Sequence, residues 1–218
     1  MKRLLAAAAV LSLAAGSVVW AETTAAPKDA PKKEQSVEEQ RRWFTEDAVA
    51  PMVKPSGYDV TIVEYMDYQC PFCRAAHGPL KQLLAKDHKV RVIFRDWPIF
   101  GQASQAAALA AIASKYQGKY VAMHDALMET PLPLNDQKIK AAAKKAGVDW
   151  AQMEKDKVAH SEEIEDLFQR NAEQADQLGL EGTPGFIIGN TQSFGGLDLK
   201  QFEQGVAAAR KEAAKKKS

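Results

Sequence analysis

Cysteine is scarce in this sequence, and that scarcity excludes several kinds of protein. Two cysteines among 218 residues are too few for a small domain held by several disulfides, or for a metal site with four thiolate ligands. An excess of one charge is also missing: 29 basic residues face 28 acidic ones, so the chain offers no dense positive field for nucleic acid. The composition, 46% hydrophobic and 26% charged, is typical of a globular protein with a sizeable core.

Long apolar runs are missing too, apart from residues 4–19. A short basic start with Lys2 and Arg3 precedes this run and small residues around Ala21 follow it, which is the pattern of a secretory signal peptide. The run falls short of the ~20 residues that span a bilayer, which argues against a membrane anchor. We therefore expect residues 1–21 to be removed on export, leaving a chain with a net charge near −1 and no stable membrane insertion.

The next residues divide into a linker and a short structured segment. Residues 22–35 are rich in Ala, Pro, Lys and Thr and lack large apolar side chains, which predicts a flexible tether. Residues 36–57 are predicted to hold a short helix, in which Ser36 and Glu39 form a capping box, and then a loop or an edge strand. The main fold is expected to begin near residue 58.

Strand and helix signals alternate in the main part of the chain. Residues 58–65 carry apolar side chains on both faces, as in a central strand, and residues 90–94 form a second strand beyond a helix that starts near the cysteines. This order predicts a right-handed βαβ unit. Residues 102–178 have helical signals, and a strand at 186–188, a short partner strand and a final helix complete an α/β fold. Helix N-caps are predicted at Asn135, Asp149 and Asp198.

The two cysteines lie in the run Cys70-Pro71-Phe72-Cys73, where the first strand leads into a helix. Pro71 suits the first helical position, which places Cys70 at the N-cap beside unpaired backbone N–H groups and the positive end of the helix dipole. Both favour the thiolate, so the pKa of Cys70 should lie below the ordinary ~8.5. Cys73, one turn inside the helix, should be less exposed. This spacing predicts dithiol–disulfide exchange, with Cys70 as nucleophile, Cys73 as resolving thiol and no cofactor besides their own disulfide.

Three other roles for the cysteine pair compete with exchange. A structural disulfide would close too short a loop to stabilise the fold much. A metal site could use the spacing C-x2-C-x3-H that His77 completes, but a fourth ligand is not evident and no metal is expected. Haem attachment requires His directly after the second cysteine, where this chain has Arg74. With His77, the histidines His88, His124 and His160 are predicted to be scattered surface or packing residues.

The run VTIVEYMDYQCPFC (residues 60–73), the later Gly182-Thr183-Pro184 and the helical block between them resemble the DsbA-like thiol:disulfide oxidoreductases of the thioredoxin superfamily. The resemblance implies a thioredoxin fold (β-α-β, then β-β-α) with an inserted helical domain. The implied parts are residues 58–99 with 179–218 for the thioredoxin-like domain, and residues 100–178 for the inserted helical domain.

The resemblance also implies roles for residues outside the cysteine run. Thr183-Pro184 is expected to contain a cis peptide bond beside the sulfurs, so that the Thr183 backbone can pair with an extended substrate; a plain loop is the alternative. Glu64, six residues before Cys70, corresponds to an acid buried beneath the cysteines. Such a carboxylate should have a raised pKa and could relay the proton of Cys73, whereas a carboxylate at the strand edge would simply reach water.

A periplasmic enzyme is implied, one that passes its disulfide to unfolded or misoxidised exported proteins. Its recycling partner would be a membrane protein, either a quinone-linked oxidase or a thiol reductase. DsbA itself carries His where this chain has Phe72, which cannot donate a hydrogen bond to the thiolate, so we expect a less oxidising pair.

Two alternatives to an oxidase remain open from the sequence. An isomerase or reductase that oligomerises through residues 22–48 would use the same chemistry. A chaperone or metal-binding module would have no redox turnover. Trp97-Pro98 and Phe100 are expected either to form an apolar rim near the thiols or to pack in the core.

Overall fold

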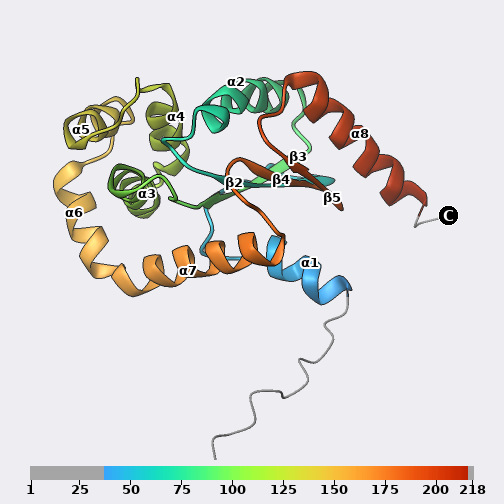
Figure 1. Ribbon diagram of the computed structural model, residues 1–218, viewed down its shortest axis with the longest axis horizontal. Helices are drawn as coiled ribbons and strands as arrows, with labels where there is room; N and C mark the ends of the chain where they lie inside the picture. The colour runs from blue at the N-terminus through green and yellow to red at the C-terminus, as the bar shows by residue number, and fades with distance from the viewer. Residues whose placement is uncertain (1–36, 216–218) are drawn as a thin grey trace, which may run out of the picture. The chain divides into compact units, whose positions relative to one another are not determined.

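A five-stranded mixed sheet forms the centre of the structure, a computed structural model that describes residues 37–215 (Figure 1). Its strands are β1 (Met52–Val53), β2 (Val60–Met66), β3 (Val90–Asp96), β4 (Gly185–Ile188) and β5 (Thr191–Phe194). They lie in the order β1-β3-β2-β4-β5, so β2 is the central strand. β2 is parallel to β3, and all other neighbouring strands are antiparallel.

Some of the predictions fall on residues that the structure does not describe. The signal peptide over residues 1–21, the tether over residues 22–35, the Ser36 cap and the end of the lysine-rich tail at 216–218 all lie outside the described residues. Within residues 37–215, no helix combines the length and apolar character needed to cross a bilayer.

The predicted βαβ unit is present. β2 and β3 pair from Val60 with Val90 to Met66 with Asp96, and α2 (Pro71–Lys86) connects them. Nearly every residue of these two strands is buried, because helices cover both faces of the sheet. The short β1 is the edge strand beyond β3.

Two pairs of helices cover the two faces of the sheet (Figure 1). α2 and α8 (Leu199–Lys215) pack together on one face, and α1 (Val37–Thr45) and α7 (Ser161–Gln177) lie on the other. The Tyr65 hydroxyl of β2 donates to the Gln174 side chain of α7 at 2.9 Å, which identifies the strand positions that point to this second face.

The segment between β3 and β4 is helical, as predicted. It contains α3 (Gln102–Ser114), a 3-10 turn (Lys115–Gln117), α4 (Tyr120–Glu129), α5 (Asp136–Lys145), α6 (Trp150–Ala159) and α7. α3 contacts α4, α5, α6 and α7, and its many alanines allow these helices to approach closely. The predicted caps are present: Asn135 and Asp149 each accept from the backbone N–H three residues on, at 2.9 and 3.0 Å.

A tight turn joins β4 to β5 and packs against the last helix. Gly189 has a φ of +61°, and a Cβ there would lie 2.6 Å from the Cβ of Ala209 in α8, so both the backbone and the packing require glycine. Beyond β5, Asp198 and Gln201 form a reciprocal cap: each side chain accepts from the other residue's backbone N–H, at 2.8 and 2.9 Å. The sequence prediction of this cap is confirmed.

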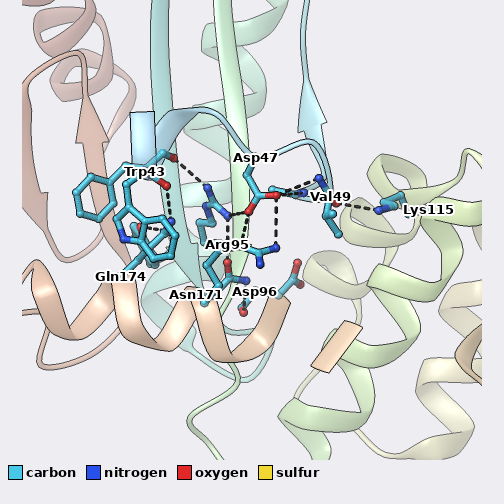
Figure 2. Close-up of polar contacts among 12 residues, drawn as sticks. Trp43, Asp47, Val49, Arg95, Asp96, Lys115, Asn171 and Gln174 are labelled. Carbon is cyan, nitrogen blue, oxygen red and sulfur yellow. Dashed lines mark hydrogen bonds and ion pairs between the residues drawn. The ribbon is translucent and has the colours of Figure 1, made fainter. Parts of the chain in front are cut away.

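A buried polar network attaches α1 to the sheet (Figure 2). Arg95 of β3 is fully buried, and its guanidinium donates to the Asp47 carboxylate at 2.6 Å and to the Phe44 carbonyl at 3.0 Å. The Gln174 side chain donates to the Trp43 carbonyl at 2.6 Å. These contacts make α1 part of the folded domain.

Candidate active site

Helix α2 begins at Pro71, and Cys70 is its N-cap residue, as the spacing predicts. The Cys70 backbone is extended (φ −74°, ψ 119°), so its sulfur turns back and accepts a hydrogen bond from the Cys73 backbone N–H at 3.4 Å. Pro71 at the first helical position has no N–H to leave unpaired. Both cysteines are thiols in this structure.

The same geometry gives the two thiols opposite acidities. Hydrogen bonds from the Cys73 side chain and from the backbone N–H groups of Cys73 and Phe72 outweigh burial and lower the pKa of Cys70 to about 6. Burial, followed by the hydrogen bond with Cys70, raises the pKa of Cys73 far above its ordinary range. At neutral pH the pair is therefore mainly a Cys70 thiolate beside a Cys73 thiol.

Cys73 is the less exposed cysteine, as expected, but the difference is small because Cys70 is nearly as buried. Cys70 is 1% exposed and Cys73 is 0% exposed, whereas Phe72 between them is 64% exposed. The reason is the capping itself, because a sulfur that turns toward the helix N–H groups turns away from solvent. A substrate must therefore displace part of the cover over Cys70 before it can react.

Thr183 and Pro184 reach the cysteines from the loop before β4. The peptide bond between them is cis. The Cys70 thiol donates to the Thr183 carbonyl at 3.1 Å, across 113 residues of sequence. The same loop lines an open pocket of about 420 Å³ together with Phe194. Its contact with the nucleophilic sulfur distinguishes this loop from the plain connection that the sequence left as an alternative.

Glu64 lies in the middle of β2, paired with Phe94 on one side and Phe186 on the other. It is buried and its Oε2 has no hydrogen-bond partner among the described residues, so the alternative of a carboxylate that reaches water is wrong. Because the next residue, Tyr65, points to α7, Glu64 points to the face that α2 covers. Burial, and then the nearby Asp96 carboxylate, raises the pKa of Glu64 well above its ordinary value.

Asp96 is a second buried acid, which the sequence analysis did not single out. It ends β3, and its Oδ2 accepts from the Tyr120 hydroxyl at 2.8 Å, while its Oδ1 has no hydrogen-bond partner within residues 37–215. Burial raises its pKa as well. The Tyr68 hydroxyl lies near Asp96 and 3.1 Å from Nδ1 of His124. Asp96 lies beyond the predicted strand at residues 90–94, so the signal that marks Glu64, an acid inside an apolar strand, does not mark it.

Asp67 organises the loop that leads into α2, and the sequence analysis missed it. Its buried carboxylate accepts from the backbone N–H groups of Ile99 and Phe100, at 2.7 and 3.1 Å, and from the Ser104 hydroxyl at 2.7 Å. Its own backbone N–H donates to the Cys73 sulfur at 3.5 Å. Asp67 therefore connects the cysteines to the loop after β3, a contact that no local pattern reveals.

Arg74 connects the active-site helix to the helical insert. Its guanidinium donates to the Tyr68 carbonyl at 2.8 Å and to the Leu127, Met128 and Thr130 carbonyls at the C-terminal end of α4. The residue that excludes haem attachment thus binds free carbonyls of a helix end.

Two of the four histidines are not scattered, contrary to the prediction. α2 packs against α4, which brings the buried rings of His77 and His124 to a centroid distance of 5.1 Å. His88 is exposed, and His160 stacks on Tyr116 at a centroid distance of 3.6 Å. Only the tertiary contact between two helices explains the first pair.

Exposed aromatic side chains belong to the segments around the cysteines. Phe72 lies between them, Phe100 follows the loop that Asp67 binds, and Phe194 lines the Thr183 pocket; all three are exposed. Trp97 instead packs against the core. Of the two alternatives for this region, the exposed apolar rim therefore applies to Phe100, and core packing applies to Trp97.

Comparisons with known proteins agree with this geometry. The family model described as a DSBA-like thioredoxin domain matches residues 61–207. The structure of a thioredoxin-like oxidoreductase from Silicibacter pomeroyi DSS-3 is similar, with 36% identity, a TM-score of 0.74 and coverage of 78% of this chain and 98% of that chain. The thiol-disulfide exchange protein alpha-DsbA2 from Wolbachia pipientis has 28% identity, a TM-score of 0.74 and coverage of 79% and 92%.

A curated relative adds one more similarity. The Na(+)/H(+) antiporter NhaA 3 of Salinispora tropica is 27% identical over 157 residues, which are 71% of this chain and 24% of the antiporter. The chain thus spans about a quarter of the length of this relative, and the similarity concerns only that portion of it.

Proposed function

The chain belongs to the family of DSBA-like thioredoxin domains, and on this basis we propose that it is a thiol:disulfide oxidoreductase that exchanges disulfides with exported proteins through Cys70 and Cys73. The observation that carries the proposal is that two thiols at one helix N-terminus have pKa values shifted in opposite directions, down for Cys70 and up for Cys73. A thiolate is the nucleophile of exchange, and a sulfur of low pKa is also a good leaving group.

The reaction of an oxidase balances on these two sulfurs. A substrate thiolate attacks Cys70 of the oxidised pair, the bond to Cys73 breaks, and Cys73 leaves and takes up a proton. A second substrate thiolate then attacks the mixed disulfide, which releases Cys70 as a thiolate and leaves a disulfide in the substrate. Two electrons pass to the cysteine pair, and a quinone-linked membrane oxidase would remove them. In the reverse direction a membrane thiol reductase would supply them.

Glu64 is suited to deliver the proton that Cys73 needs. It is buried on the sheet face that α2 covers, and its raised pKa lets it hold a proton nearer to neutral pH than an ordinary carboxyl group. Protonation of Cys73 as it leaves lowers the barrier to cleavage of the disulfide. We assign Glu64 this role as a proton relay.

The surroundings of Thr183 favour an extended polypeptide as substrate. The Cys70 thiol can donate to the Thr183 carbonyl only while it carries a proton. In the thiolate and in the disulfide, that carbonyl is free to accept an N–H from a substrate strand. The exposed aromatic rings of Phe72, Phe100 and Phe194 offer apolar contacts to unfolded or misoxidised proteins.

Two observations favour an oxidase of intermediate strength over an oligomeric isomerase. The pKa of Cys70 is lowered, but Phe72 stands where DsbA has a His that can donate a hydrogen bond to the thiolate. We therefore expect a reduction potential between about −270 and −120 mV.

In addition, the Trp43 and Phe44 carbonyls of α1 are bound by Gln174 and Arg95 of the same chain, which supports a monomer.

The decisive experiment follows oxidation of a reduced, unfolded ribonuclease by the oxidised protein. Cys70→Ser should abolish the reaction. In Cys73→Ala, the Cys70 thiolate can still attack a disulfide of scrambled ribonuclease, and the mixed disulfide should accumulate because no second thiol resolves it. Full function of Cys70→Ser in cells would instead assign a chaperone or metal-binding role.

Direction and location need separate measurements. Equilibration with glutathione gives the potential, and a value near that of thioredoxin would reverse the assignment to a reductase. A dimer or trimer by light scattering that also unscrambles ribonuclease would assign an isomerase. For the periplasm, the proposed location, sequencing of the exported protein should find a new N-terminus after Ala21.

A further inference from the structure

His77 of α2 meets His124 and Asp125 of α4 on the buried side of the active-site helix, and we propose that these three residues bind a divalent metal ion, with Zn²⁺ as the best fit. One potential ligand atom of each residue lies within 4.8 Å of those of the other two. Two imidazole nitrogens and one carboxylate oxygen are a ligand set that zinc uses.

The spacing between His77 and Asp125 suits a shared ion. Nε2 of His77 lies 3.3 Å from Oδ1 of Asp125. Two ligands about 2.0 Å from a tetrahedral zinc are roughly 3.3 Å apart, so the pair needs little movement. Apart from this contact with Asp125, the buried Nε2 of His77 makes no hydrogen bond among the described residues. Buried polar atoms are rarely left so, and a metal would satisfy this one.

His124 has the supporting contact that zinc-binding histidines usually have. The Tyr68 hydroxyl lies 3.1 Å from Nδ1 of His124. When Nδ1–H donates to the Tyr68 oxygen, Nε2 keeps its lone pair for the metal and the ring is held in place.

Asp125 provides the opening of the site to solvent. Its side chain is 30% exposed, and its Oδ2 pairs with Nζ of Lys81 at 2.9 Å, which leaves Oδ1 directed at His77. The positive charges of Lys81 and Arg74 nearby oppose an incoming cation. We therefore expect weaker binding than at a four-cysteine site, with water in the fourth position.

The ion would connect the two parts of the fold that carry the chemistry. His77 lies four residues after Cys73 on the same face of α2, and α4 belongs to the helical insert. Binding should therefore stabilise the position of the active-site helix against the insert. The site uses neither thiol, so it is independent of dithiol–disulfide exchange.

The test uses the full chain in its oxidised state, in which the Cys70–Cys73 disulfide cannot bind metal. After treatment with a chelator, titration with Zn²⁺ in a calorimeter should show one equivalent bound, and the melting temperature should rise with zinc. Asp125→Asn and His77→Gln should each weaken binding by about 100-fold or more, because even outer-shell changes cost about 10–100-fold.

His88→Gln, which alters an exposed histidine, is the matched control and should bind zinc like the unaltered chain. Co²⁺ in place of zinc should give visible d–d absorption without a sulfur charge-transfer band. If His77→Gln fails to fold, Asp125→Asn decides alone, because its side chain is partly exposed. Absence of stoichiometric binding, binding unchanged in Asp125→Asn, or a sulfur band in the oxidised protein would each overturn the proposal.

Discussion

The two faces of the central sheet bury charge in opposite ways. On the face that α1 and α7 cover, Arg95 pairs with Asp47, which also receives a hydrogen bond from Arg170 at 2.8 Å (Figure 2). On the face that α2 and α8 cover, Glu64 and Asp96 each keep one carboxylate oxygen without a hydrogen-bond partner in the described part of the chain. One face therefore compensates its buried charge and the other does not.

The acidities follow this difference. Burial would raise the pKa of Asp47, but the hydrogen bonds and charges of Arg95 and Arg170 outweigh it and lower the pKa to about 2. Burial raises the pKa of Glu64 and of Asp96, and no cation in the described part of the chain opposes it. A paired buried charge holds the fold together, whereas an uncompensated acid costs stability but stores a proton. The second kind lies on the side of the cysteines.

The largest expected effect comes from removing Arg95, the buried partner of Asp47. Arg95→Met would leave Asp47 buried with one of its two cations missing, and the free energy of unfolding should fall by about 3–5 kcal/mol. Urea unfolding measures this. Arg210→Met removes a partly exposed arginine that pairs with Asp59 and Asp87, and should cost less than about 1 kcal/mol. Equal losses in the two variants would contradict the comparison.

A second effect on this face depends on pH. The pKa of Asp47 is about 2 in the folded chain and 3.8 when unperturbed, so its contribution is present above pH 4 and is lost as the pH falls toward 2. The contribution is about 2 kcal/mol. Unfolding free energies measured from pH 5 to pH 2 should show this loss in the unaltered chain and not in Asp47→Asn. A parallel decline in both would assign the acid sensitivity to other groups.

Glu64, on the uncompensated face, should make the free energy of unfolding depend on pH in the opposite direction to Asp47. Because the folded pKa of Glu64 is raised, its contribution to stability is present at low pH and is lost as the pH rises above the ordinary carboxyl range. The loss is at most about 1.4 kcal/mol per pH unit for one proton. Glu64→Gln should remove this slope and also slow the release of Cys73 from its disulfide.

Denaturation across pH 5–8 and stopped-flow exchange kinetics measure the two consequences of Glu64→Gln. Glu203→Gln is the matched control, because Glu203 is exposed on α8 and pairs with Lys86. It should leave both the pH slope and the exchange rate unchanged. Normal exchange kinetics in Glu64→Gln would remove Glu64 from the proton relay.

The smallest expected effect lies outside the sheet. Phe72→His places a hydrogen-bond donor beside the Cys70 thiolate, which should stabilise the reduced pair and raise the reduction potential by about 30 mV for each tenfold change in the exchange equilibrium. Glutathione equilibration measures the shift. An unchanged potential would mean that other groups control the thiolate.

Much of the fold could be predicted because its signals are local. Caps such as Asn135 and Asp149 act over three residues, and the βαβ unit follows from strand and helix patterns within about forty residues. The roles of Asp67 and Arg74 could not be predicted in this way. Their partners come from the loop after β3 and from the end of α4, which become neighbours only when the chain packs.

By itself, the sequence determined where α2 starts and which sulfur caps it, because Pro71 and the spacing of Cys70 and Cys73 act within one helical turn. Only the tertiary structure decided that the Thr183 carbonyl meets that sulfur and that His77 meets His124. Hydrogen bonds within a turn depend on neighbours in the chain. Contacts between distant segments depend on how helices pack on the sheet, and packing involves the whole core at once.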